Sequence, residues 1–187
     1  MFRLKFLKIV SLLFFIIVLS SNLNAQKSLG IGLSLDYSPL IKYQESIFAL
    51  KKGNGFGYSI FSSIRNQNLI SKIKFSSFLI KFEIGNSNFT DRRNIMTISL
   101  GYFLKNKKLP KFEFPISILV GAGPKIRNIF SSTTVGIELG AHYFISNKVS
   151  SFFEVSHLAD WFTKPKELSI KNLFILSLGI KYNLADL

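Results

Sequence analysis

The stretch SLGIGLSLDY, residues 28–37, alternates large apolar residues with small or polar ones. Leu, Ile and Tyr occupy the odd positions, and Gly, Ser and one Asp occupy the even positions. Alternation with a period of two predicts a β-strand with two chemically different faces. Glycine is unfavourable in strands and serine is small, so a face built from them indicates a narrow, enclosed space rather than open water.

The same pattern recurs along the chain and predicts eight strands in total. The further segments are residues 55–65, 69–84, 95–104, 112–123, 134–145, 149–156 and 172–184. Within 69–84 the apolar residues change phase between Phe75 and Phe78, which predicts a β-bulge near Ser76–Ser77. This change of phase assigns Phe78 to the large apolar face and Lys81 to the small polar face.

The connections between these segments alternate in length. The short ones are residues 66–68, 105–111 and 146–148, and the longer ones are 38–54, 85–94, 124–133 and 157–171. An even number of strands with short turns at one end and longer loops at the other is typical of outer-membrane barrels. The predicted fold is therefore all-β, an eight-stranded antiparallel up-and-down transmembrane β-barrel. Its large face meets lipid and its small face fills an interior with no open pore. The alternative is a secreted soluble barrel or sandwich with the large residues inside.

The N-terminus has the pattern of a secretory signal peptide. Arg3, Lys5 and Lys8 precede the apolar run IVSLLFFIIVL, residues 9–19. We therefore expect a cleaved signal peptide over residues 1–25 and the barrel over 26–187. An uncleaved anchor is the alternative, but the run is short against the roughly 20 residues that a spanning helix needs.

Two segments carry a resemblance to a known family. GIELGAHYFISNKVSSFFEVSH (136–157) and the last strand, LSLGIKYNL (176–184), resemble the small outer-membrane β-barrel domain proteins of Gram-negative bacteria, the OmpX/OmpA-like barrels. The resemblance implies a monomer in the bacterial outer membrane, inserted by the barrel-assembly machinery, with a structural or surface-interaction role. The chain departs from that family at its end, where NLADL follows Tyr182 in place of a terminal aromatic residue. An accessory role in envelope secretion is a further alternative, by fold analogy alone.

Several charged residues fall on the small, inward face. A charge in a narrow interior is costly unless it is paired, so the pattern predicts an interior salt-bridge network. A proton or ion path, or paired carboxylates for acid–base chemistry, is the functional alternative. The predicted network consists of Asp36, Arg65, Lys81, Glu83, Glu113, Glu138, Glu154 and Lys181.

The two histidines are the weak catalytic candidates, together with Glu154. His142 has the inward phase and is expected to be a buried, hydrogen-bonded residue. The segment EVSHLADWFTKPK (154–166) resembles the region of outer-membrane lipid A deacylases that carries a His-x-Ser motif, but Ala159 stands where the serine nucleophile would be. Because neighbours on a strand point to opposite faces, Ser156 is not aligned with His157. We therefore expect no enzyme, with a lipid A hydrolase as the alternative.

The chain has 24 Lys and Arg against 10 Asp and Glu, and no Cys. The absence of thiols excludes disulfides and cysteine metal sites, and no metal or cofactor is expected. The signal peptide argues against nucleic acid as the basic chain's partner. Outer-membrane lipids, above all lipopolysaccharide phosphates, are the expected partners of the loop cations, although solvated charges are the alternative. These cations are Lys51, Lys52, Arg92, Arg93, Lys125, Arg127, Lys164 and Lys166. For the lysines of the 105–111 turn, a partner protein and anionic headgroups both stay open.

Overall fold

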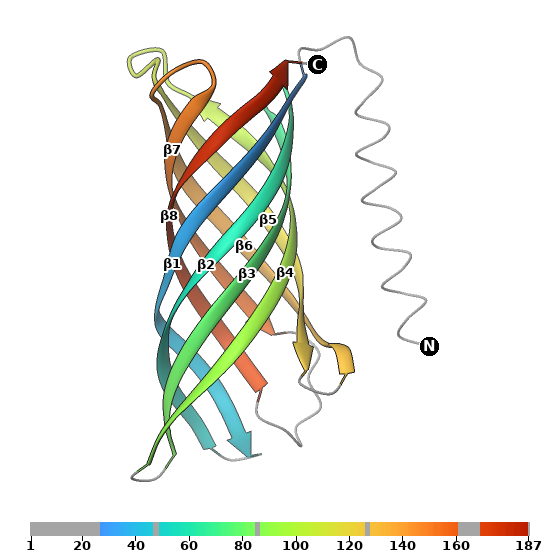
Figure 1. Ribbon diagram of the computed structural model, residues 1–187, viewed down its shortest axis with the longest axis vertical. Coiled ribbons are helices and arrows are strands. Elements are labelled where there is room, and N and C mark those ends of the chain that lie inside the picture. The colour runs from blue at the N-terminus through green and yellow to red at the C-terminus, as the bar shows by residue number, and fades with distance from the viewer. Residues whose placement is uncertain (1–26, 47–48, 85–86, 126–127, 161–168, 187) are drawn as a thin grey trace.

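The computed structural model describes residues 27–46, 49–84, 87–125, 128–160 and 169–186 (Figure 1). The expected signal peptide lies outside these ranges. The strands are β1 (Lys27–Ser46), β2 (Ala49–Asn66), β3 (Leu69–Ile84), β4 (Ser87–Lys105), β5 (Phe112–Lys125), β6 (Asn128–Phe144), β7 (Val149–Asp160) and β8 (Ser169–Asp186). Among the described residues, no helix is long and apolar enough to cross a membrane.

The eight strands form one closed barrel in chain order, and every neighbouring pair is antiparallel. The barrel closes where β8 pairs with β1, from Ser28 opposite Asp186 to Gln44 opposite Ser169. Closure leaves no free strand edge, which a lipid environment requires because it offers no hydrogen bonds to the backbone. The predicted fold class is confirmed.

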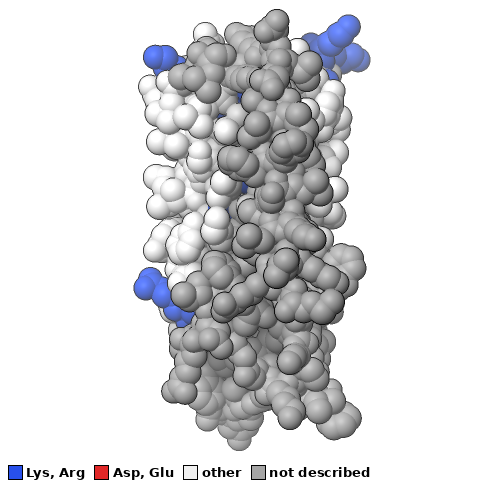
Figure 2. Space-filling model, turned by 90° about the vertical axis from the view of Figure 1, so that its right-hand side faces the viewer, with Lys and Arg blue, Asp and Glu red and all other residues white. Residues whose placement is uncertain are grey.

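The outer surface is a belt of large apolar side chains. In the opening stretch, Leu33 and Leu35 are 61% and 74% exposed, whereas Ser34 and Asp36, which alternate with them, are buried. On the face drawn in Figure 2, blue Lys and Arg atoms lie above and below a band of other residues. The large face therefore points outward, and the alternative with the large residues inside is wrong.

The small inward residues make room for aromatic rings from neighbouring strands. Gly32 on β1 lies opposite Phe61 on β2, and a Cβ at Gly32 would lie 2.2 Å from that ring. Gly179 on β8 lies opposite Phe152 on β7 in the same way, at 2.5 Å. The two rings meet edge to face with centroids 5.3 Å apart. These rings fill an interior that is narrow because the barrel has only eight strands.

The predicted bulge in β3 is wrong. The registers of β3 with β2 and with β4 run past Ser76–Ser77 without a shift. Phe78 and Ile80 therefore point inward and are at most 3% exposed, and Lys81 is exposed on the outside. The physical reason is a change in the interior itself, which toward this end is lined by a buried apolar cluster. The cluster consists of Ile41, Phe78, Ile80, Ile95, Leu119, Leu158, Leu173 and Ile175.

Three of the four predicted long loops are mostly strand. The ladders of β1–β2, β3–β4 and β5–β6 continue up to the residues that flank their connections at 47–48, 85–86 and 126–127. A longer ladder gives hydrogen-bond partners to backbone groups that a loop would leave to solvent. Backbone pairing does not require alternating large and small side chains, so the alternation did not reveal these parts of the strands. We call this end of the barrel the hairpin end. The other end, with residues 67–68, 106–111 and 145–148, is the turn end.

The apolar belt lies toward the turn end. On β3 its exposed apolar residues run from Leu69, the first residue of the strand, to Leu79, and the strand then continues to Ile84. This stretch matches the roughly 9–11 residues that cross a bilayer as a tilted strand. The strands thus project beyond the belt at the hairpin end, which identifies it as extracellular and the turn end as periplasmic.

Candidate functional site: the charge network inside the barrel

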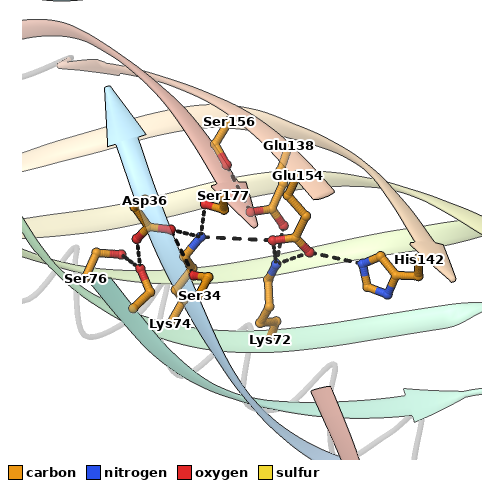
Figure 3. A network of polar contacts seen from close by, with 11 residues as sticks. Ser34, Asp36, Lys72, Lys74, Ser76, Glu138, His142, Glu154, Ser156 and Ser177 are labelled. Atoms are coloured by element: carbon orange, nitrogen blue, oxygen red, sulfur yellow. Dashed lines mark hydrogen bonds and ion pairs between the residues drawn. The ribbon is translucent and has the colours of Figure 1, made fainter. Parts of the chain in front are cut away.

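Lys72 on β3 is the centre of a buried polar network (Figure 3). Its Nζ donates to both carboxylate oxygens of Glu154 on β7, at 2.8 Å each, and to the carboxylate of Glu138 on β6. The side chains of all three residues are at most 3% exposed. One ammonium group therefore connects strands from opposite sides of the barrel.

Each carboxylate has a second partner. His142 Nε2 lies 3.2 Å from Glu154 Oε1, and Ser156 Oγ donates to Glu138 Oε2 at 3.0 Å. The His142 ring packs against the rings of Phe103 and Phe152, with centroids 5.5 Å away in both cases. The histidine is thus held by packing on one side and by Glu154 on the other.

Lys74 extends the network toward Asp36. Its Nζ donates to Ser177 Oγ at 3.0 Å and lies 4.0 Å from Asp36 Oδ1. Asp36 in turn accepts from Ser34 Oγ at 2.8 Å and from Ser59 Oγ. Short inward residues let these groups reach one another across a narrow space, and hydrogen bonds compensate part of the cost of burying them.

Arg65 and Glu113 form a separate pair toward the turn end. The guanidinium Nη1 and Nη2 donate to the two carboxylate oxygens at 2.6 and 2.7 Å, a bidentate arrangement. The Arg65 guanidinium also lies 4.5 Å from the centroid of the Phe103 ring. Lys105 Nζ, on the rim, is 3.7 Å from Glu113 Oε1.

The interior network contains charges of both signs, and Arg93, opposite the inward Phe78, also has the inward phase. The cations of the network are Arg65, Lys72, Lys74 and Lys181, and the anions are Asp36, Glu113, Glu138 and Glu154. Chemically, the arrangement is a polar plug inside a lipid-facing shell.

The structure places most of the predicted network inside the barrel, with one correction. Asp36, Arg65, Glu113, Glu138, Glu154 and Lys181 are all inward. Lys81 is outside, because the phase of β3 does not change, and the side chain of Glu83 lies outside the described residues. The prediction missed Lys72 and Lys74. The alternation of these lysines with the outward Ile73 and Phe75, before the expected bulge, already gives both the inward phase.

His157, the second histidine named as a catalytic candidate, points to the outside of the barrel. His157 is exposed on the outer face, opposite Ile137 on β6 and Phe174 on β8. Ser156 and Glu154 point inward, where they bind Glu138 and Lys72. The structure therefore does not bring His157 together with these two residues.

The predicted lipopolysaccharide-contacting cations are described only in part. Arg92 is exposed, and Arg93 is half-buried and has a partner. Lys51, Lys52 and Lys125 belong to strands, but their side chains lie outside the described residues, as do Arg127, Lys164 and Lys166 altogether.

The fold is shared with solved outer-membrane barrels. Neisserial surface protein A (NspA) superposes with a TM-score of 0.61 at 12% identity, over 83% of this chain and 97% of that one. OprG from Pseudomonas aeruginosa superposes with a TM-score of 0.54 at 10% identity, over 86% of this chain and 96% of that one. Ail, the attachment invasion locus protein of Yersinia pestis, superposes with a TM-score of 0.52 at 11% identity, over 85% of this chain and 99% of that one. No protein-family model and no curated protein sequence matches the chain. Closed as eight antiparallel strands, with its apolar belt outside and its charges inside, the chain is a small transmembrane β-barrel of the bacterial outer-membrane type.

Proposed function

We propose that this protein is a monomeric, non-conducting barrel that has a structural and surface-interaction role in the outer membrane, where the barrel-assembly machinery inserts it. The observation that supports this proposal is the Lys72–Glu138–Glu154 network together with the Phe61 and Phe152 rings, all buried in one narrow interior. An eight-stranded barrel has room for side chains and no more. Ions would have to displace paired charges to pass.

Conductance in planar lipid bilayers tests this role. We expect that the refolded chain inserts, as shown by a mobility difference between unboiled and boiled samples in a detergent gel, and that it gives no discrete current steps. A heat-dependent mobility with reproducible current steps would overturn the closed-barrel proposal. A chain without the mobility difference, recovered soluble, would overturn the membrane placement.

The surface partner that we propose is the phosphorylated lipid of the outer leaflet. Lys81 and Arg92 are exposed on the outer wall around Leu79, where the belt ends toward the hairpin end. In the β3–β4 register, Lys81 lies opposite Thr90 and Arg92 lies opposite Leu79, so the two cations are diagonal neighbours. Two adjacent cations at the border of the belt suit a lipid phosphate. The Ail structure is a complex with the heparin analogue sucrose octasulfate.

Lipid A with and without its phosphates tests this partner. We expect diphosphorylated lipid A in the micelle to raise the temperature at which the folded gel band is lost, and dephosphorylated lipid A to raise it less. The double variant Lys81→Gln/Arg92→Gln should remove the difference between the two lipids. A variant of equal charge at the turn end, Lys111→Gln/Lys148→Gln, is the matched control and should retain more of the difference. An equal response of all three proteins to both lipids would contradict the assignment.

A further inference from the structure

The charges on the outside of the described barrel are all of one sign. Each of the four acidic side chains that the structure describes is buried inside the barrel: Asp36, Glu113, Glu138 and Glu154. The exposed described lysines and arginines are Lys81 and Arg92 near the hairpin end, and Lys105, Lys107, Lys108, Lys111 and Lys148 at the turn end. Five cations thus lie on the rim at the periplasmic side.

These five lysines belong to two turns that are joined to each other. Lys105 ends β4, the β4–β5 turn carries Lys107, Lys108 and Lys111, and the β6–β7 turn carries Lys148. The Phe144 N–H, at the end of β6, donates to the Lys111 carbonyl at 2.9 Å. The lysines therefore occupy one continuous arc of the rim, here called the lysine arc.

The backbone of the lysine arc is ordered by its own hydrogen bonds. The Leu109 and Phe112 N–H groups donate to the carbonyls of Asn106 and Leu109, at 3.0 and 2.9 Å. The Asn183 N–H on β8 donates to the Lys148 carbonyl at 2.8 Å. Turns held in this way present their side chains without a large ordering cost on binding.

The positive charge of the arc is not neutralised within the described residues. Glu113, the nearest described carboxylate, is already bound by both guanidinium nitrogens of Arg65, and only Lys105 approaches it, at 3.7 Å. Lys107, Lys108, Lys111 and Lys148 have no carboxylate partner in the part of the chain that the structure describes. The arc therefore has a net positive charge available to an anion.

Apolar side chains continue from the belt into the same two turns. Leu109 lies between Lys108 and Lys111 and is 43% exposed, and Ile145 in the other turn is 58% exposed. The exposed tyrosines Tyr102, Tyr143 and Tyr182 lie near this end of their strands, as an interfacial aromatic girdle does. A soluble acidic partner would explain the lysines alone. A membrane surface explains the lysines, the leucine, the isoleucine and the tyrosines together.

We infer that the lysine arc binds the phosphates of anionic phospholipid headgroups in the periplasmic leaflet, with Leu109 and Ile145 inserted among the acyl chains. The inference rests on the proposed membrane placement and adds a lipid class and a surface to it. The phosphate is that of a lipid such as phosphatidylglycerol and not of a free ion, because Leu109 and Ile145 need the acyl region that only the lipid supplies.

Spin-labelled lipids in reconstituted vesicles test the inference. The full chain is inserted into phosphatidylcholine vesicles, and electron paramagnetic resonance measures the association of spin-labelled phosphatidylglycerol relative to spin-labelled phosphatidylcholine. We expect a preference for phosphatidylglycerol that weakens as salt is raised. In Lys107→Gln/Lys108→Gln/Lys111→Gln/Lys148→Gln the preference should fall about fivefold or more. Lys105 is retained in this variant because of its contact with Glu113.

Three controls make the result decisive. The pair Lys111→Gln/Lys148→Gln should lose more of the preference than the pair Lys81→Gln/Arg92→Gln, which removes the same charge at the other border of the belt. An equal loss in both pairs would overturn the assignment to the arc.

Abolition of the preference by millimolar glycerol phosphate would show a free-phosphate site and also overturn it. If the mobility difference shows a folded, inserted wild type without any lipid preference, the inference fails while the proposed membrane placement stands. If the chain does not insert, both fail.

Discussion

Lys72 and Glu154 face each other across the interior of the barrel, with the lysine Nζ 2.8 Å from both carboxylate oxygens. The two residues are 82 positions apart and belong to β3 and β7, which share no ladder. Backbone hydrogen bonds join each strand only to its neighbours. This ion pair therefore supplies a connection across the barrel that the ladders do not make.

The first prediction concerns the removal of Lys72. The variant Lys72→Met removes the cation that binds the buried carboxylates of Glu138 and Glu154, and leaves Glu154 with Lys74 at 4.0 Å. Breaking a buried pair by deleting one partner costs about 3–5 kcal/mol. Urea unfolding in detergent micelles, followed by loss of the folded gel band, should show this decrease in the free energy of unfolding.

The control for this prediction is Lys81→Met, an identical substitution on the outside of the same strand. Because Lys81 is exposed, its loss should change the free energy of unfolding by about 0.5 kcal/mol or less. Equal midpoints for Lys72→Met and the unchanged chain would contradict the central place of Lys72 in the network.

The second prediction concerns the bidentate pair at the periplasmic mouth. Arg65→Ala, Glu113→Gln and the double variant form a double-mutant cycle. We expect a coupling free energy of about 1 kcal/mol, smaller than that of a fully buried pair because the Arg65 side chain is 17% exposed. The coupling should persist at 1 M salt, since the Phe103 ring covers one face of the guanidinium. Zero coupling at low salt would show that the two groups act independently.

The third prediction concerns the fit of Gly32 against Phe61. In Gly32→Ala the new methyl group would overlap the Phe61 ring, which is itself packed against Phe152. Overpacking of this kind costs about 1–3 kcal/mol in the free energy of unfolding. The double variant Gly32→Ala/Phe61→Leu should lose less stability than the sum of the single variants, because the shorter side chain frees the space. Simple additivity would rule out a steric cause.

The fourth prediction separates the two histidines. His142→Leu removes the contact to the buried Glu154 carboxylate and should cost about 1–3 kcal/mol of unfolding free energy. His157→Leu is on the outer wall and should change it by about 0.5 kcal/mol or less. The comparison uses the same detergent unfolding assay for both variants.

The histidine variants also test the enzyme alternative. Mass spectra of lipid A from cells with the unchanged chain, with His157→Leu and without the protein should be identical. Loss of an acyl chain only in cells with the unchanged protein would establish the lipid A hydrolase and refute the proposed non-enzymatic role.

Most of the fold follows from the alternation of large and small residues along each strand. Leu33 and Leu35 face outward and Ser34 faces inward, as the pattern predicts, because a side-chain period of two is a property of any strand. The alternation fails as a guide beyond Phe75, where large residues occur in both phases. Only the ladders, which run through Ser76 without a shift, decide which of them point inward.

The sequence by itself determined that this chain is a barrel with small residues inside and an apolar face outside, because that information is local to each strand. Tertiary structure alone decided which charges meet. Lys72, Glu138 and Glu154 come from three strands, and their contact depends on how far each strand is staggered against the next around a closed ring. That stagger accumulates over every pairing in the barrel, so no single segment encodes it. For the same reason, only the folded barrel gathers the rim lysines of two separate turns into one arc.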